Sequence, residues 1–209
     1  MQKQNTLADS FSLEGKGLHT GLNIHITFNP APENHGYKIK RTDLLEQPII
    51  DAVAENVINT QRGTVIGKKD IQISTIEHAM AALYAAGIDN CLIEVDAPEF
   101  PILDGSSRFY TEGISKVGLK KQTANKQYYI VKHKIEVKDE ETGASIMILP
   151  EDNFSVNVLV SYNSPVLTNQ YAVMDDLSQF PSEISASRTF VFVREIEMLI
   201  QNNLIKGGD

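Results

Sequence analysis

The amino-acid sequence predicts an α+β protein made of two similar units, the second of them incomplete. Three observations support this prediction. Strand patterns of period two precede helix patterns of period 3.6 in the first 118 residues, a polar run without periodicity occupies residues 119–127, and strand patterns begin again after it. A chain of 209 residues has room for two units of roughly 100 residues each. We therefore expect a first domain at 1–120, a linker at 121–127 and a partial second domain at 128–209.

The first unit begins with strands. Residues 22–28 alternate apolar and polar side chains, which is typical of a strand with one buried face. Residues 37–41 form a second strand candidate. Residues 63–66 and 71–73 flank a Gly-Lys-Lys-Asp turn, and this arrangement predicts a hairpin.

Helices and one more strand complete the first unit. A helix is expected to begin near Ser74, with Gly87 positioned to end it. The apolar run 91–95 predicts a buried strand. A second helix should run to about residue 117 and end at Gly118, and Asp104 is placed to cap its beginning.

The second unit repeats the strand part of this order. Strands are predicted at 129–137, in the segment ASIMIL and in the segment SVNVLV, followed by a short strand and a helix within ISASRTFVFVREIEMLIQNN. No helix–strand–helix pattern completes this unit. We therefore expect that the chain is cut inside its second domain.

Composition excludes several classes of function. A net charge of -8 argues against a surface for nucleic acid or for an anionic membrane, because both need dense Lys and Arg patches. No run of about 18 apolar residues predicts a membrane span, so no stable membrane anchor is expected. The single cysteine, Cys91, excludes an intramolecular disulfide and fits a reducing compartment. The cytoplasm is the expected location.

The start of the first helix carries an adjacent Glu77 and His78, and two interpretations compete for them. The spacing of Ser74 and Glu77 matches a capping box, in which both side chains bind backbone N–H groups. Alternatively, His78 is one ligand of a hydrolytic zinc ion and Glu77 takes the proton of the attacking water. From this stretch alone the cap is the more common arrangement, and one His does not make a metal site.

The other candidate groups do not complete a zinc site. His25 and His133 lie in strand patterns and His35 lies in a polar loop. Cys91 sits in a buried-strand pattern, where an inert core thiol is more common than a nucleophile. A cysteine hydrolase is therefore a weak alternative.

Four stretches combine into a resemblance. GKGLHTG (15–21), TVIGKKDIQISTIEHAMAAL (64–83), GIDNCLIEVDAPEFPILDGSS (87–107) and ISASRTFVF (184–192) occur in this order. Together they resemble the N-terminal two-thirds of the zinc-dependent UDP-3-O-acyl-N-acetylglucosamine deacetylases of bacterial lipid A biosynthesis. The resemblance implies two α+β sandwich domains of similar topology, like domain 2 of ribosomal protein S5, with the active site between them. It also implies a UDP-linked, 3-O-acylated sugar as the substrate.

The resemblance also implies roles for individual residues. His78 would be the first zinc ligand, Glu77 the general base, and His19 and Thr64 neighbours of the active site. The insert that forms the passage for the acyl chain would include a further five residues: Thr189, Phe190, Phe192, Ile196 and Leu199. Phe190 or Phe192 could instead be strand core, and Ile196 and Leu199 could be ordinary helix packing.

Two zinc ligands and one histidine of the family pattern have no match in this sequence. The only His-Lys pair, His133–Lys134, lacks the acidic residue that the family has after it. We therefore expect a zinc site that is incomplete within residues 1–209 and no catalysis by this polypeptide alone. The alternative from another class is a non-catalytic binding or structural module, in which Ser74 and Glu77 form only a helix cap.

Overall fold

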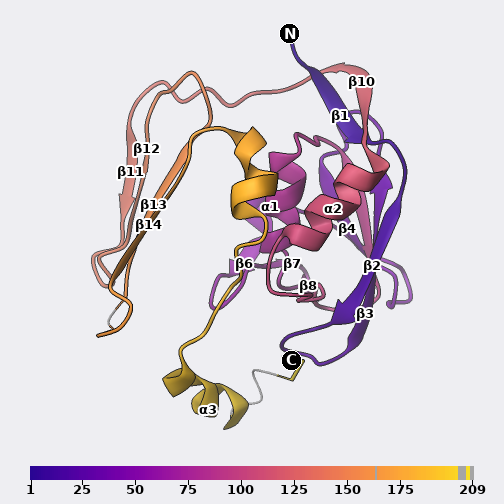
Figure 1. The fold of residues 1–209 in the computed structure, drawn as a ribbon. Helices are drawn as coiled ribbons and strands as arrows, with labels where there is room; N and C mark the ends of the chain where they lie inside the picture. Colours follow the sequence, from indigo (N-terminus) through magenta and orange to yellow (C-terminus); the bar gives the residue numbers. More distant parts are fainter. Residues whose placement is uncertain (163, 202–205, 208–209) are drawn as a thin grey trace.

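The computed structural model describes residues 1–162, 164–201 and 206–207, without the side chains of 194, 199 and 200. It has the α+β architecture predicted from the sequence: several β-sheets with few helices (Figure 1). Among the described residues, no helix combines the length and the apolar character needed to cross a membrane. The division into two similar sandwich domains stays a prediction.

A five-stranded sheet forms the centre of the first part. Its strand order is β2-β3-β9-β4-β5, and only β4 and β9 pair in parallel. The strands are β2 (Phe11–Lys16), β3 (Asn23–Pro30), β9 (Cys91–Val95), β4 (Tyr37–Arg41) and β5 (Ile49–Asp51). The predicted strands at 22–28, 37–41 and 91–95 are therefore confirmed, although Leu22 lies outside β3 and is exposed.

Two helices pack on this sheet and close the core. They are α1 (Glu77–Ala85) and α2 (Arg108–Val117). Gly87 and Gly118 follow these helices with φ values of 72° and 75°, as predicted for glycines that end helices. Asp104 does not cap α2: the N-cap is Ser107, and the Asp104 carboxylate instead accepts the N–H and the hydroxyl of Ser106 at 3.1 and 2.7 Å.

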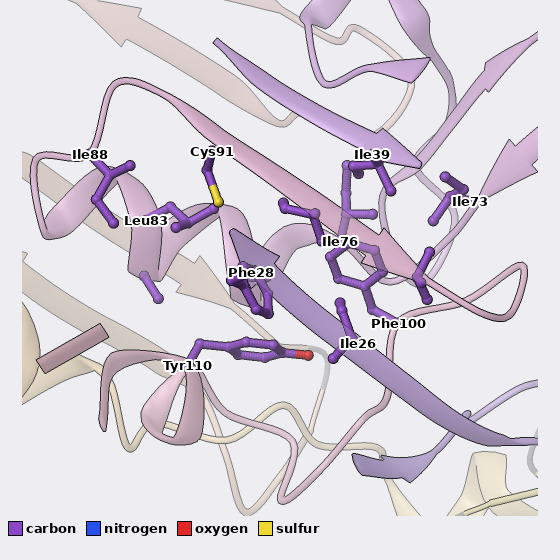
Figure 2. Packing of buried hydrophobic residues seen from close by; sticks show 14 of the residues in the cluster. Ile26, Phe28, Ile39, Ile73, Ile76, Leu83, Ile88, Cys91, Phe100 and Tyr110 are labelled. Carbon is purple, nitrogen blue, oxygen red and sulfur yellow. The ribbon is translucent and has the colours of Figure 1, made fainter. Parts of the chain in front are cut away.

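Aromatic rings join the sheet to α2 (Figure 2). Phe28 on β3 stacks on Phe11 with 4.8 Å between ring centroids. Tyr110 on α2 meets Phe28 edge-on, with 5.7 Å between centroids. Leu83 and Cys91 are fully buried beside them. Alternating strand residues and one stripe of each helix thus meet in a single core.

Smaller sheets flank the core. The predicted hairpin is present as β7 (Val65–Lys68) and β8 (Ile71–Ile73), with β6 (Val57–Asn59) as a third strand and the one-turn η1 (Ala54–Asn56) before it. β10 (Leu119–Asn125) pairs antiparallel with β1 (Lys3–Leu7), so residues 121–125 belong to a strand that the sequence did not predict. The linker between two domains at 121–127 stays a prediction.

The second part consists of two separate hairpins and short helices. The elements are β11 (Ile135–Lys138), β12 (Ser145–Ile148), β13 (Val156–Ser161), β14 (Asn169–Met174), η2 (Leu177–Gln179), η3 (Phe180–Ile184) and α3 (Val193–Gln201). Figure 1 shows the hairpins on the side of α1 away from β2 and β3. The helix predicted after residue 192 is confirmed. The short strand predicted before it is wrong, because residues 187–192 form neither strand nor helix.

Candidate active site

The turn before α1 does not form the predicted capping box. The N-cap is Ile76, in the right-handed helical region, and no side chain of the described residues caps the helix. Ser74 instead joins a short bridge to the segment 98–100: its N–H donates to the Pro98 carbonyl at 3.0 Å, and its carbonyl accepts the Phe100 N–H at 3.0 Å. The prediction that Glu77 binds back to Ser74 is therefore wrong. The capping box was the feature that favoured a purely structural role for Glu77, and the structure does not contain it.

The Glu77 carboxylate is held by a different segment. The backbone N–H of Thr64, just before β7, donates to its Oε2 at 2.9 Å. A Cβ on Gly63 would lie only 3.3 Å from Oε1, so the chain passes close to the carboxylate there. Burial raises the pKa of the Tyr110 hydroxyl, and the charge of Glu77 raises it further. Glu77 thus sits at the helix start among groups from three parts of the chain, and the residue as a whole is half-buried.

His78 follows Glu77 on the first turn of α1 and is also half-buried. Successive helical side chains point about 100° apart, so the two can approach a bound group from different sides. A hydrolytic zinc ion needs three protein ligands. Among the described residues no group of three His, Cys, Asp or Glu side chains could hold a metal ion. The residues that the structure describes therefore do not by themselves fit a hydrolytic zinc site.

The loop that carries His19 is fixed by Glu99. The backbone N–H groups of His19 and Thr20 donate to the two oxygens of the Glu99 carboxylate, each at 2.9 Å, and Glu99 is fully buried. Sequence reasoning missed this residue. A lone Glu between two prolines reads as an exposed loop position, and no local signal shows that its carboxylate is enclosed.

The residues expected near the acyl chain gather in two places. The Thr189 N–H donates to the Gly105 carbonyl at 2.8 Å, which ties this segment to the turn before α2. Phe190, Phe192 and Tyr162 form a mutually edge-on cluster with centroids 5.4–5.7 Å apart. Phe190 is 55% exposed, so it is not core.

α3 follows this aromatic cluster. Ile196 is half-buried on α3, and the side chain of Leu199 lies outside the described residues. Glu195 on the same helix pairs with Arg62 at 3.3 Å, next to the segment that holds Glu77. This ion pair is partly exposed on both sides and contributes at most about 1 kcal/mol.

Cys91 does not offer a second active site. Burial raises the pKa of its thiol to about 12, so the reactive thiolate is scarce near neutral pH.

An open hollow of about 500 Å³ over β2 and β3 is lined by Glu14, Lys16, His25 and Asp96 among others, and by neither Glu77 nor His78.

Comparisons with known proteins agree with the motif pattern. The family model described as UDP-3-O-acyl N-acetylglycosamine deacetylase matches residues 4–209. Bifunctional LpxC/FabZ enzymes of Bacteroides thetaiotaomicron and Porphyromonas gingivalis are 63% and 60% identical over 209 residues, which is 100% of this chain and 45% of each relative. A UDP-3-O-acyl-N-acetylglucosamine deacetylase of Methylococcus capsulatus is 40% identical over 211 residues, covering 100% of this chain and 69% of the relative. The chain thus spans about half the length of the bifunctional relatives that it matches.

Proposed function

The chain belongs to the UDP-3-O-acyl N-acetylglycosamine deacetylase family, and on this premise we propose that the protein acts in the hydrolytic N-deacetylation of UDP-3-O-acyl-N-acetylglucosamine in lipid A biosynthesis. The names of its relatives support the reaction and the substrate class. The single free cysteine, buried in β9, supports a cytoplasmic location. We further propose that residues 128–209 are part of a second α+β sandwich similar to the first.

Glu77 is the proposed proton acceptor. The observation that supports this role is its hydrogen bond to the Thr64 N–H, which orients the carboxylate away from the helix backbone that a cap would bind. In the reaction, a water oxygen bonds to the acetyl carbonyl carbon while Glu77 takes the water proton. The C–N bond then breaks, the nitrogen takes that proton, and acetate and a free amine leave.

His78 is the proposed first zinc ligand, and a bound zinc ion would polarise the carbonyl and acidify the water. No group of three His, Cys, Asp or Glu side chains among the described residues could hold the ion, so no step through zinc is derived from this chain. Because a lone His binds zinc weakly, we propose that residues 1–209 alone are catalytically inactive. Zinc bound one-to-one by the 209-residue chain would contradict this part of the proposal.

The acyl chain is the proposed partner of the aromatic cluster. Phe190, Phe192 and Tyr162 present apolar rings at a partly exposed position, and Ile196 and Leu199 would extend this apolar wall along α3. Thr189 would orient the sugar beside the turn at Gly105. An apolar passage explains how a protein with net charge -8 can act on an amphiphilic substrate.

The test compares Glu77→Gln with the wild type in the native-length polypeptide. The amide keeps an oxygen for the Thr64 N–H but cannot accept a proton, so kcat should fall by about 10²- to 10⁴-fold with little change in thermal stability. Glu112→Gln, at an exposed position of α2, is the matched control and should keep wild-type turnover. His78→Ala should lose bound zinc, measured by metal analysis. Wild-type kcat in Glu77→Gln, or no zinc in the native-length wild type, would overturn the assignment.

A further inference from the structure

Glu99 is a charged residue enclosed in the protein interior, with no exposed surface. Its Oε1 accepts the N–H of His19 at 2.9 Å and the hydroxyl of Thr75 at 3.4 Å. Its Oε2 accepts the N–H and the hydroxyl of Thr20 at 2.9 and 2.8 Å. All four partners donate, and they come from two segments that are more than 50 residues apart in the sequence.

One of these segments leads directly into α1 and is strained. Thr75 has a φ of 60°, a conformation that β-branched residues rarely adopt, and it is buried. Such a residue persists only where its surroundings determine its conformation. Glu99 and its two neighbours fix the conformation of Thr75. The backbone of Ser74 bonds to Pro98 and Phe100, and the Thr75 hydroxyl donates to the Glu99 carboxylate.

The other segment approaches Glu99 closely enough to require glycine. A Cβ on Gly17 would lie 2.5 Å from Glu99 Oε2, well inside van der Waals contact. The loop between β2 and β3 therefore wraps its backbone around the carboxylate. Glu99 Oε1 accepts from both His19 of this loop and Thr75, which lies two positions before Glu77.

We propose that Glu99 is a positioning residue, which sets the His19 loop and the first turn of α1 in one fixed relation. This inference rests on the proposed deacetylase function, since it assigns Glu99 to the support of Glu77 and His78. Glu99 does not touch the reacting atoms. It acts by fixing the backbone that carries His19, Glu77 and His78.

The test is Glu99→Gln in the native-length polypeptide. The amide has one accepting oxygen and one donating NH₂ group, so whichever way it faces, one backbone N–H of the loop meets a donor. We expect hydrogen exchange of the His19 and Thr20 amides to speed up about tenfold or more. We expect kcat to fall by about 10- to 100-fold, because small displacements of catalytic groups have effects of this size. KM should change less than kcat.

A matched control separates positioning from general loss of stability. Asn90 is also buried, and its side chain bonds to Gly36, Gln4 and Gln122 away from the His19 loop. Asn90→Ala should lower the melting temperature but keep wild-type kcat and wild-type exchange at His19 and Thr20. Equal loss of kcat in Asn90→Ala and Glu99→Gln at equal loss of stability would overturn the proposal.

A milder variant covers the case in which Glu99→Gln does not fold. Thr20→Val removes one of the four contacts and should lower kcat in the same direction by a smaller factor. Wild-type kcat and wild-type amide exchange in Thr20→Val would then overturn the proposal. If the native-length wild type itself shows no deacetylase activity, the proposed function is contradicted. If the wild type is active and Glu99→Gln is equally active, only the role proposed for Glu99 is contradicted.

Discussion

Replacing Ser74 by Ala distinguishes the helix cap expected from the sequence from the arrangement in the structure. In a capping box this change costs about 0.5–2 kcal/mol of unfolding free energy. Among the residues that the structure describes, the Ser74 hydroxyl donates to the Pro98 carbonyl, at 3.4 Å, which is the upper end of hydrogen-bond length. The backbone bonds of Ser74 to Pro98 and Phe100 do not depend on its side chain. We therefore expect a loss of at most about 0.5 kcal/mol.

A double-mutant cycle makes this expectation sharper. Glu77→Ala should cost about 1 kcal/mol, because the Thr64 N–H loses its partner. Since Ser74 and Glu77 share no partner in the structure, the coupling energy of the double variant should stay below about 0.5 kcal/mol. Urea unfolding followed by circular dichroism and tyrosine fluorescence gives these values, because the chain has seven Tyr and no Trp.

The chain offers its own positive control for a capping box. At η2 the Asp176 side chain accepts the Ser178 N–H at 2.7 Å, and the Gln179 side chain accepts the Asp176 N–H at 3.2 Å. Asp176→Ala should therefore cost about 1 kcal/mol. A loss above about 1 kcal/mol for Ser74→Ala, together with coupling of similar size to Glu77, would contradict the arrangement in the structure and support the capping box.

Three further predictions concern the core and its ionisable groups. Phe28→Ala should lower the unfolding free energy by about 3–5 kcal/mol, because Phe28 is fully buried against Tyr110; a loss below about 1 kcal/mol in urea titrations would contradict the packing. Burial raises the pKa of the Cys91 thiol from 9.0 to about 12. Between these pH values the thiol stays protonated in the native state but is deprotonated in the unfolded state. Stability should therefore fall as pH rises from about 9 to about 12, and Cys91→Ser, which removes this group, should show a shallower fall. The Arg41 guanidinium lowers the pKa of the Asp43 carboxyl from 3.8, so the stability from this pair is present above that pH and is lost on acidification. Asp43→Asn should reduce the acid dependence of unfolding and, at pH 7, cost about 1–3 kcal/mol, because the buried Arg41 keeps the Gln72 carbonyl but loses its carboxylate partner. An unchanged acid midpoint would contradict this.

Patterns in the sequence predicted the strands and helices in which buried residues recur at a regular spacing. Alternation in residues 22–28 predicted β3, and Gly87 and Gly118 marked the ends of α1 and α2. The same local signals failed for β1 and β10, since β10 is polar and mostly exposed and is stabilised by backbone pairing with residues more than 100 positions away. Strand pairing of this kind leaves no hydrophobic period to detect.

The candidate site divides in the same way. Residues of the family motifs, including Glu77 and His78, could be identified without a structure, because these motifs are short and keep their order along the chain. The partner of the Glu77 carboxylate and the burial of Glu99 beneath the His19 loop became known only from the folded chain. The physical reason is that a hydrogen-bond partner is chosen by distance in space, and the donors to Glu77 and Glu99 lie on segments that meet only when the sheet and its helices have packed.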